Sequence, residues 1–139
     1  MKKSRRYFLL ALIIVLCFGI LAGISSAVSV DLQKGEGSKI SSTFLTANRV
    51  RLVGRIYETS DHGAYFTNLV ETSTGSYVED TTIFKNYTDT GSHDDNGVRY
   101  NAVYQISTTQ STSCAWKVRI NPYRLYNDAR ATAFIRQYP

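Results

Sequence analysis

The sequence predicts an all-β protein: a small antiparallel β-sandwich or barrel of about six to seven strands, preceded by an N-terminal hydrophobic signal helix. After residue 27, Val, Ile and Thr number 29, whereas the helix-favouring Ala and Leu number 12. β-Branched residues fit a pleated, half-buried surface. Apolar and polar residues also alternate with a period of two in several segments, which is the pattern of a strand with one buried face.

The first 27 residues have the three-part layout of a secretory signal peptide. Met1–Arg6 is basic, Tyr7–Ile24 is an uncharged and mostly apolar run, and Ser25 and Ala27 place small residues before a cut after position 27. The apolar run is also long enough for an uncleaved signal anchor. Both alternatives place the basic end in the cytoplasm. We therefore expect a secreted protein, or a single-pass anchored protein with its C-terminal domain outside.

The basic start of this segment leaves two export routes open. Ser4–Leu9 (SRRYFL) resembles the twin-arginine export motif over those six residues;. The strongly apolar run that follows favours the general secretory route.

The exported part is expected to divide into a spacer and one domain. Residues 28–38 hold two glycines, mixed charges and no periodicity, which is typical of a flexible spacer;. Residues 39–139 are long enough to bury one core and are expected to form the all-β domain. The exported part carries 12 basic and 11 acidic residues. This near-neutral balance gives no reason to expect nucleic acid as a partner.

In the first half of the domain, we expect strands at Ile40–Thr46, Val50–Ile56, Ala64–Thr72 and Tyr77–Tyr87. The clearest is Val50–Ile56, in which Val50, Leu52, Gly54 and Ile56 share one face. Polar, Gly-containing turns at residues 61–63 and 73–75 separate the later strands;.

In the second half, we expect strands at Val98–Ile106, Cys114–Ile120 and Ala131–Tyr138. Asn96-Gly97 is a strong hairpin signal, because a tight turn needs residues at positive φ. We expect this turn to pair the strand that ends near Tyr87 with the strand that starts at Val98. Within that strand, Tyr100 and Tyr104 are expected to face the core.

The last segment is ambiguous. Residues 131–138 alternate as a strand would, but Asp128 could cap a short helix from Ala129 to Gln137;.

Cys114 would be the one cysteine left after signal cleavage. It shares a face with Trp116 and the next two apolar residues, so we expect a buried and inert thiol. The alternative is a reactive or bridging thiol. A Cys–His enzyme would need His62 or His93 beside the thiol, and both histidines lie in polar turns;.

No catalytic, cofactor or metal site is expected. The acidic segment Asp89–Gly97 resembles a calcium loop in its oxygen ligands, but Val103 stands where the bidentate glutamate should be;. Paired carboxylates, a Gly-rich phosphate loop and a Ser-His-Asp pattern are all missing from the sequence.

Basic residues on two predicted strands form the candidate binding face for an anion or a partner. They are Arg49, Arg51, Arg55, Lys117 and Arg119. If the two strands were neighbours, these side chains would make a stripe suited to phosphate or lipid headgroups. The alternative is an ordinary solvated face whose charges are balanced by acidic residues.

We therefore expect a small exported protein that is not an enzyme and that acts by binding or as a structural module. Its partner would be an extracellular protein, a glycan or an anionic surface. One alternative is a secreted antimicrobial or toxin-like protein that acts on membranes, and a further alternative is a small secreted hydrolase. Outside the antimicrobial alternative, membrane contact is expected only through the N-terminal segment.

Overall fold

The computed structural model describes residues 27–89, 91–124 and 126–139. These ranges contain ten strands: β1 Val28–Leu32, β2 Lys39–Ile40, β3 Leu45–Ala47, β4 Val50–Tyr57, β5 Ala64–Glu71, β6 Tyr77–Lys85, β7 Ser92–His93, β8 Arg99–Ile106, β9 Cys114–Pro122 and β10 Ala131–Gln137. Apart from Ala27, the expected signal peptide and its helix lie outside the described residues. Within the described ranges, no helix is long and apolar enough to cross a membrane.

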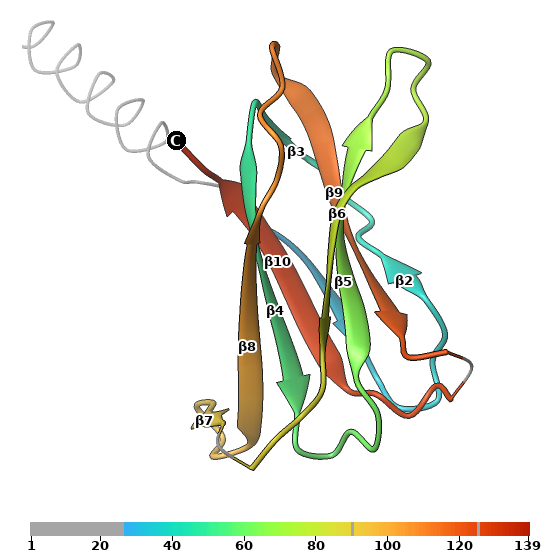
Figure 1. Cartoon of the computed structure of the whole chain (residues 1–139), viewed down its shortest axis with the longest axis vertical. Helices are drawn as coiled ribbons and strands as arrows, with labels where there is room; N and C mark the ends of the chain where they lie inside the picture. The colour runs from blue at the N-terminus through green and yellow to red at the C-terminus, as the bar shows by residue number, and fades with distance from the viewer. Residues whose placement is uncertain (1–26, 90, 125) are drawn as a thin grey trace, which may run out of the picture.

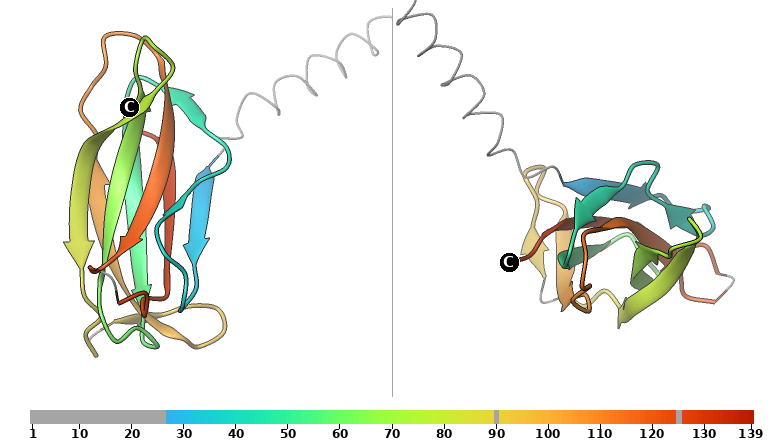
Figure 2. Two further views of the ribbon diagram at one scale, coloured as in Figure 1. Left: turned by 90° about the vertical axis from the view of Figure 1, so that its right-hand side faces the viewer. Right: turned by 90° about the horizontal axis from the view of Figure 1, so that it is seen from above.

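The strands form two antiparallel sheets that pack as a β-sandwich (Figure 1). The first sheet has the order β1-β10-β4-β8-β7. The second has the order β2-β9-β5-β6, and β3 also pairs with β9. Figure 2 shows the two layers edge-on and from above. The all-β prediction is confirmed. Of the two predicted architectures, sandwich and barrel, the structure has the sandwich.

The core lies between the two sheets and is built from the inward-facing residues of strands in both of them. Its largest fully buried side chains include Trp116, Phe66, Leu32, Leu52, Ile56, Ile120 and Ile135. Trp116 donates a hydrogen bond from Nε1 to the carbonyl oxygen of Ala47 at 2.7 Å. This bond satisfies the one polar group of the indole and ties β9 to β3.

Gly54 allows the two sheets to approach closely at the middle of β4. A Cβ atom placed on Gly54 would lie 2.6 Å from the ring of Phe66, which is fully buried on β5. A side chain at position 54 would therefore have to displace the buried ring of Phe66.

The number of strands exceeds the predicted six to seven for two reasons. The expected strand Ile40–Thr46 is divided into β2 and β3, which pair with different parts of β9. In addition, β1 and β7 were not expected.

The prediction that residues 28–38 form a flexible spacer is wrong for its first part. Val28–Leu32 is β1, which pairs with β10 at the edge of the first sheet. Val28 and Leu32 are buried, with Val30 between them on the same face. The strand is stabilised by the core and by a neighbouring strand, neither of which a short segment reveals by itself.

The predicted turn at Asn96-Gly97 exists, but its predicted partner strand is wrong. Gly97 has φ of 77° and its amide bonds the carbonyl of Asp94 at 3.0 Å. The hairpin joins β8 to the short β7, whereas β6 pairs with β5 in the other sheet. Between Lys85 and Ser92 the chain crosses from one layer to the other.

The predicted buried face of β8 is also wrong. Asn101 and Val103 point into the sandwich and are buried, whereas Tyr104 is 57% exposed. The Asn101 side chain can be buried because its Oδ1 accepts a hydrogen bond from the backbone amide of Thr88 at 2.6 Å;. Tyrosine, with its apolar ring and polar tip, tolerates either face.

The ambiguous last segment is a strand. Ala131–Gln137 forms β10, which lies between β1 and β4 and pairs with both. Its Ala131, Ala133 and Ile135 are fully buried.

Candidate functional site

The structure divides the predicted basic face between the two sheets. Arg51 and Arg55 lie on β4 of the first sheet, and Arg49 directly precedes that strand. Lys117 and Arg119 lie on β9 of the second sheet. All of these positions alternate with core residues and therefore point outward, on opposite sides of the sandwich. The five residues do not form one stripe.

Two arginines that the sequence analysis did not include join the β4 group. Arg136 on β10 is the direct cross-strand partner of Arg51. Arg130 precedes β10, and its carbonyl accepts the backbone amide of Tyr57 at the end of β4. Both arginines could have been found from the sequence. If the last segment is a strand, its period of two places positions 130, 132, 134 and 136 on one face.

We name this outward side of β10, β4 and β8 the arginine face. It is defined by Arg49, Arg51, Arg55, Arg130 and Arg136. Arg51 and Arg55 are four residues apart on one strand, which is about 13 Å at about 3.3 Å per residue.

Every guanidinium of the arginine face lies over an aromatic ring. The distances from guanidinium carbon to ring centroid are 4.9 Å for Arg49 on Tyr138, 4.8 Å for Arg51 on Tyr104, 4.6 Å for Arg55 on Tyr100, 4.8 Å for Arg130 on Tyr57 and 4.9 Å for Arg136 on Phe134. Such stacking uses the flat side of the guanidinium and holds the side chain in place. The Nε atoms of Arg49 and Arg55 are buried without a hydrogen-bond partner among the described residues, so at these two residues only the terminal N–H groups could meet an anion.

The arginine face lacks carboxylates to balance its charge. None of the residues of β10, β4 and β8 is Asp or Glu. Four ion pairs exist among the described residues, and none involves an arginine of this face. Asp31, on the neighbouring edge strand β1, accepts a hydrogen bond from Gln33. By contrast, Arg119 on the opposite face is paired with Glu79.

A hollow of about 300 Å³ borders the arginine face along β8. Tyr100 and Tyr104, which lie under Arg55 and Arg51, contribute to its wall, and Lys85 of β6 lines another part. A ligand on the arginine face can therefore extend toward a further cation.

Cys114 is half-exposed, so the prediction of a packed core thiol is wrong. Its register places it on the inward side of β9, across from Ala47. It is the first residue of the strand, however, and lies beyond the buried Trp116. Its Sγ is 3.5 Å from the carbonyl oxygen of Thr112 and lines an open hollow of about 450 Å³ beside Phe44.

Within the described ranges, no group of three or more His, Cys, Asp or Glu side chains could hold a metal ion. The two histidines that a Cys–His enzyme would need contact other residues: His62 pairs with Asp128, and His93 accepts a hydrogen bond from Arg99. The Sγ of Cys114 contacts the carbonyl oxygen of Thr112. The chain matches no protein-family model and no curated protein.

Proposed function

We propose that this protein is exported and acts outside the cell as a non-enzymatic binding module, and that its arginine face binds an anionic polymer. The observation that carries the proposal is the cross-strand pair of Arg51 and Arg136, which lies on strands that carry no carboxylates. Like charges placed directly opposite one another destabilise a sheet. A bound sulfate, phosphate or carboxylate would remove that repulsion.

The geometry favours a polymer over a single small anion. Arginines follow β4 along its whole length, from Arg49 before the strand to Arg130 beside its end. That distance is about 26 Å, at about 3.3 Å per residue. A polyanion with repeated charged groups can contact several arginines together, and each further contact raises the effective concentration of the next.

The test is retention of the purified protein on immobilised dextran sulfate, with uncharged dextran as the reference. We expect binding that weakens with salt, because exposed charges are screened. Replacing Arg51 and Arg136 together by Gln is expected to weaken binding by about tenfold or more, which corresponds to about 1.4 kcal/mol or more.

The matched control replaces Lys117 and Arg119 by Gln, which removes the same formal charge from the opposite face. If both double variants lose affinity equally, only net charge matters and the arginine face is not the site. Leakage of anionic phosphatidylglycerol vesicles at the same protein concentrations would instead support the membrane-active alternative.

A further inference from the structure

Loops at one end of the sandwich bring five aromatic rings together, in a place separate from the arginine face. This ring cluster consists of His62, Tyr65, Phe84, Tyr123 and Tyr126. The rings of His62 and Tyr126 are stacked at 4.1 Å with an interplanar angle of 6°. Tyr65 contacts Phe84 at 4.8 Å, and Phe84 contacts Tyr123 at 5.3 Å. Tyr123 lies 6.3 Å from both His62 and Tyr126 and so joins the two groups. Residues from β5, β6 and two connections therefore form one cluster, in which the ring of Phe84 is tilted by 46° to Tyr65 and by 51° to Tyr123.

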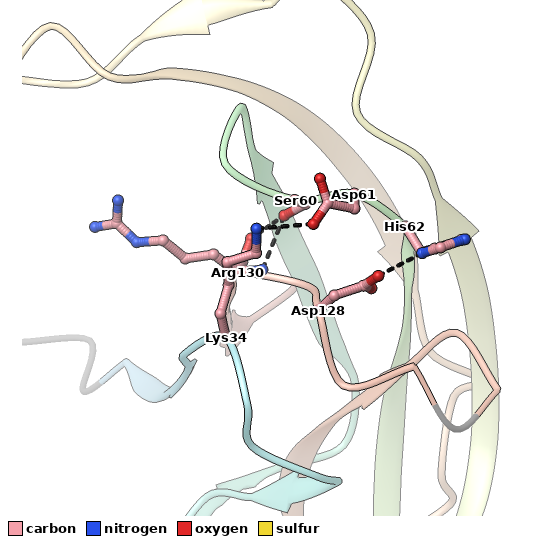
Figure 3. Close-up of polar contacts among 6 residues, drawn as sticks. All are labelled: Lys34, Ser60, Asp61, His62, Asp128 and Arg130. Carbon is pink, nitrogen blue, oxygen red and sulfur yellow. Dashed lines mark hydrogen bonds and ion pairs between the residues drawn. The ribbon is translucent and has the colours of Figure 1, made fainter.

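Hydrogen bonds between the two connections hold the ring cluster in place. Nδ1 of His62 lies 2.5 Å from a carboxylate oxygen of Asp128, as the dashed line in Figure 3 shows. The backbone amide of Tyr123 donates to the carbonyl of Gly63 at 2.9 Å, and that of Asp61 donates to the carbonyl of Asp128 at 3.4 Å. The rings are thus positioned before any ligand arrives, which lowers the entropic cost of binding.

The connection that carries Tyr126 contains two non-glycine residues with left-handed backbone. Arg124 has φ of 54° and Asn127 has φ of 49°. Asparagine adopts this region fairly easily, whereas arginine does so at a cost. Such strained positions concentrate at functional sites, because the surrounding structure must impose them.

The chemistry of the ring cluster is amphipathic. Tyr126 is 54% exposed and Phe84 is 36% exposed. The hydroxyls of Tyr65, Tyr123 and Tyr126 make no hydrogen bond within the described part of the chain, so they are available to polar groups of a ligand. Flat apolar rings with polar tips suit a partner that is apolar on one face and polar at its edge.

The local charge favours an uncharged ligand. The carboxylate of Asp128 contacts the ring of His62, and Asp61, which precedes His62 in the chain, is paired with Lys34. The hydrogen bond from Lys34 holds the pKa of Asp61 below its ordinary value, so this carboxylate stays ionised at neutral pH;. The guanidinium of Arg124 lies 5.0 Å from the ring centroid of Tyr123, so cations and carboxylates are both present here and neither sign dominates. The central strands of the arginine face, by contrast, carry arginines and no carboxylates.

We infer that the ring cluster binds a pyranose unit of a neutral polysaccharide. A pyranose ring presents an apolar C–H face, which would stack on Tyr126 and Phe84, and equatorial hydroxyls, which would bond the tyrosine hydroxyls. In Figure 3 the side chain of Arg130, a member of the arginine face, points away from the His62–Asp128 pair. The two surfaces can therefore be occupied together.

Affinity electrophoresis tests the inference, with the purified protein run in gels that contain hydroxyethylcellulose, laminarin, galactomannan or dextran. We expect at least one of these neutral polysaccharides to retard the protein. Tyr126→Ala is expected to raise its dissociation constant by about tenfold. Tyr126→Phe keeps the ring and is expected to retain most of the affinity.

Phe44→Ala is the matched control, because Phe44 is a 57% exposed aromatic residue that directly precedes β3 and is not a member of the ring cluster. It is expected to bind as the parent does. Phe84→Leu preserves apolar volume but removes the flat ring, and we expect it to lose affinity as Tyr126→Ala does. The inference is overturned if none of the four polysaccharides retards the parent, or if Tyr126→Ala and Phe44→Ala behave alike. A neutral polysaccharide that binds all variants equally would contradict it as well.

Discussion

Arg51 on β4 and Arg136 on β10 are direct partners in an antiparallel pair of strands, and both are exposed. The Cβ atoms of such a pair are about 5 Å apart, a spacing at which like charges repel. Their guanidinium groups are directed apart by stacking, Arg51 on Tyr104 and Arg136 on Phe134. The stacking reduces the repulsion without neutralising it, and the remaining positive potential is what an anionic ligand would meet.

The first prediction follows from this repulsion. Arg136→Glu places opposite charges across the pair and is expected to stabilise the protein by about 0.2–1 kcal/mol. The gain should be largest at low salt and shrink as salt screens the charges. Urea unfolding at two salt concentrations measures it, and binding of the same variant to dextran sulfate should weaken.

Arg119→Glu is the control for this prediction. Arg119 is paired with Glu79, so the change replaces an ion pair with two like charges. We expect destabilisation, in contrast to Arg136→Glu. If both variants shift the urea midpoint in the same direction, net charge rather than the local pair determines the stability.

The second prediction concerns the close contact of the two sheets at Gly54. Gly54→Ala would place a methyl group against the ring of Phe66, and we expect a loss of about 1–3 kcal/mol, because a well-packed core resists added volume;. Phe66→Leu leaves space at this point. In a double-mutant cycle measured by urea unfolding, the two changes together should therefore cost less than their sum. Additive effects on the free energy of unfolding would show that positions 54 and 66 are not coupled.

The third prediction tests the β7–β8 turn. Gly97→Val is expected to cost about 1–3 kcal/mol, because a β-branched residue is strained at positive φ although the surrounding space is open;. Gly37→Val is the control, since Gly37 also has open space around it but no positive φ. Equal denaturant midpoints for the two variants would contradict the assigned turn.

The fourth prediction concerns Cys114. Because its side chain is half-exposed, we expect a water-soluble maleimide to label the folded protein without denaturant. Labelling of the unfolded chain should be faster, since part of the side chain is covered in the native state. Mass spectrometry over a time course measures both rates. Modification that requires denaturant would show that the thiol is packed in the core after all.

The sequence alone was sufficient for the fold class and for the central strands. The alternation in Val50–Ile56 and Cys114–Ile120 predicted the correct buried faces, including those of Leu52 and Trp116. Large aliphatic and indole groups have one favourable location, so their spacing determines the face. In β8 the same reasoning failed, because tyrosines 100 and 104 are stable on either face and the buried Asn101 depends on a hydrogen bond from Thr88, which is distant in the sequence.

Arg49, Arg51 and Arg55 were predicted to share one face by strand periodicity, and they do. Whether Lys117 and Arg119 lie beside them depended on which strands are neighbours, and local pattern carries no information about that. Only the tertiary structure showed that β10 lies beside β4, so that Arg136 is the cross-strand partner of Arg51. It also showed that β9 belongs to the other sheet. Strand order is decided by how the whole chain buries its apolar faces together, whereas the direction of each side chain follows from the backbone of its own strand.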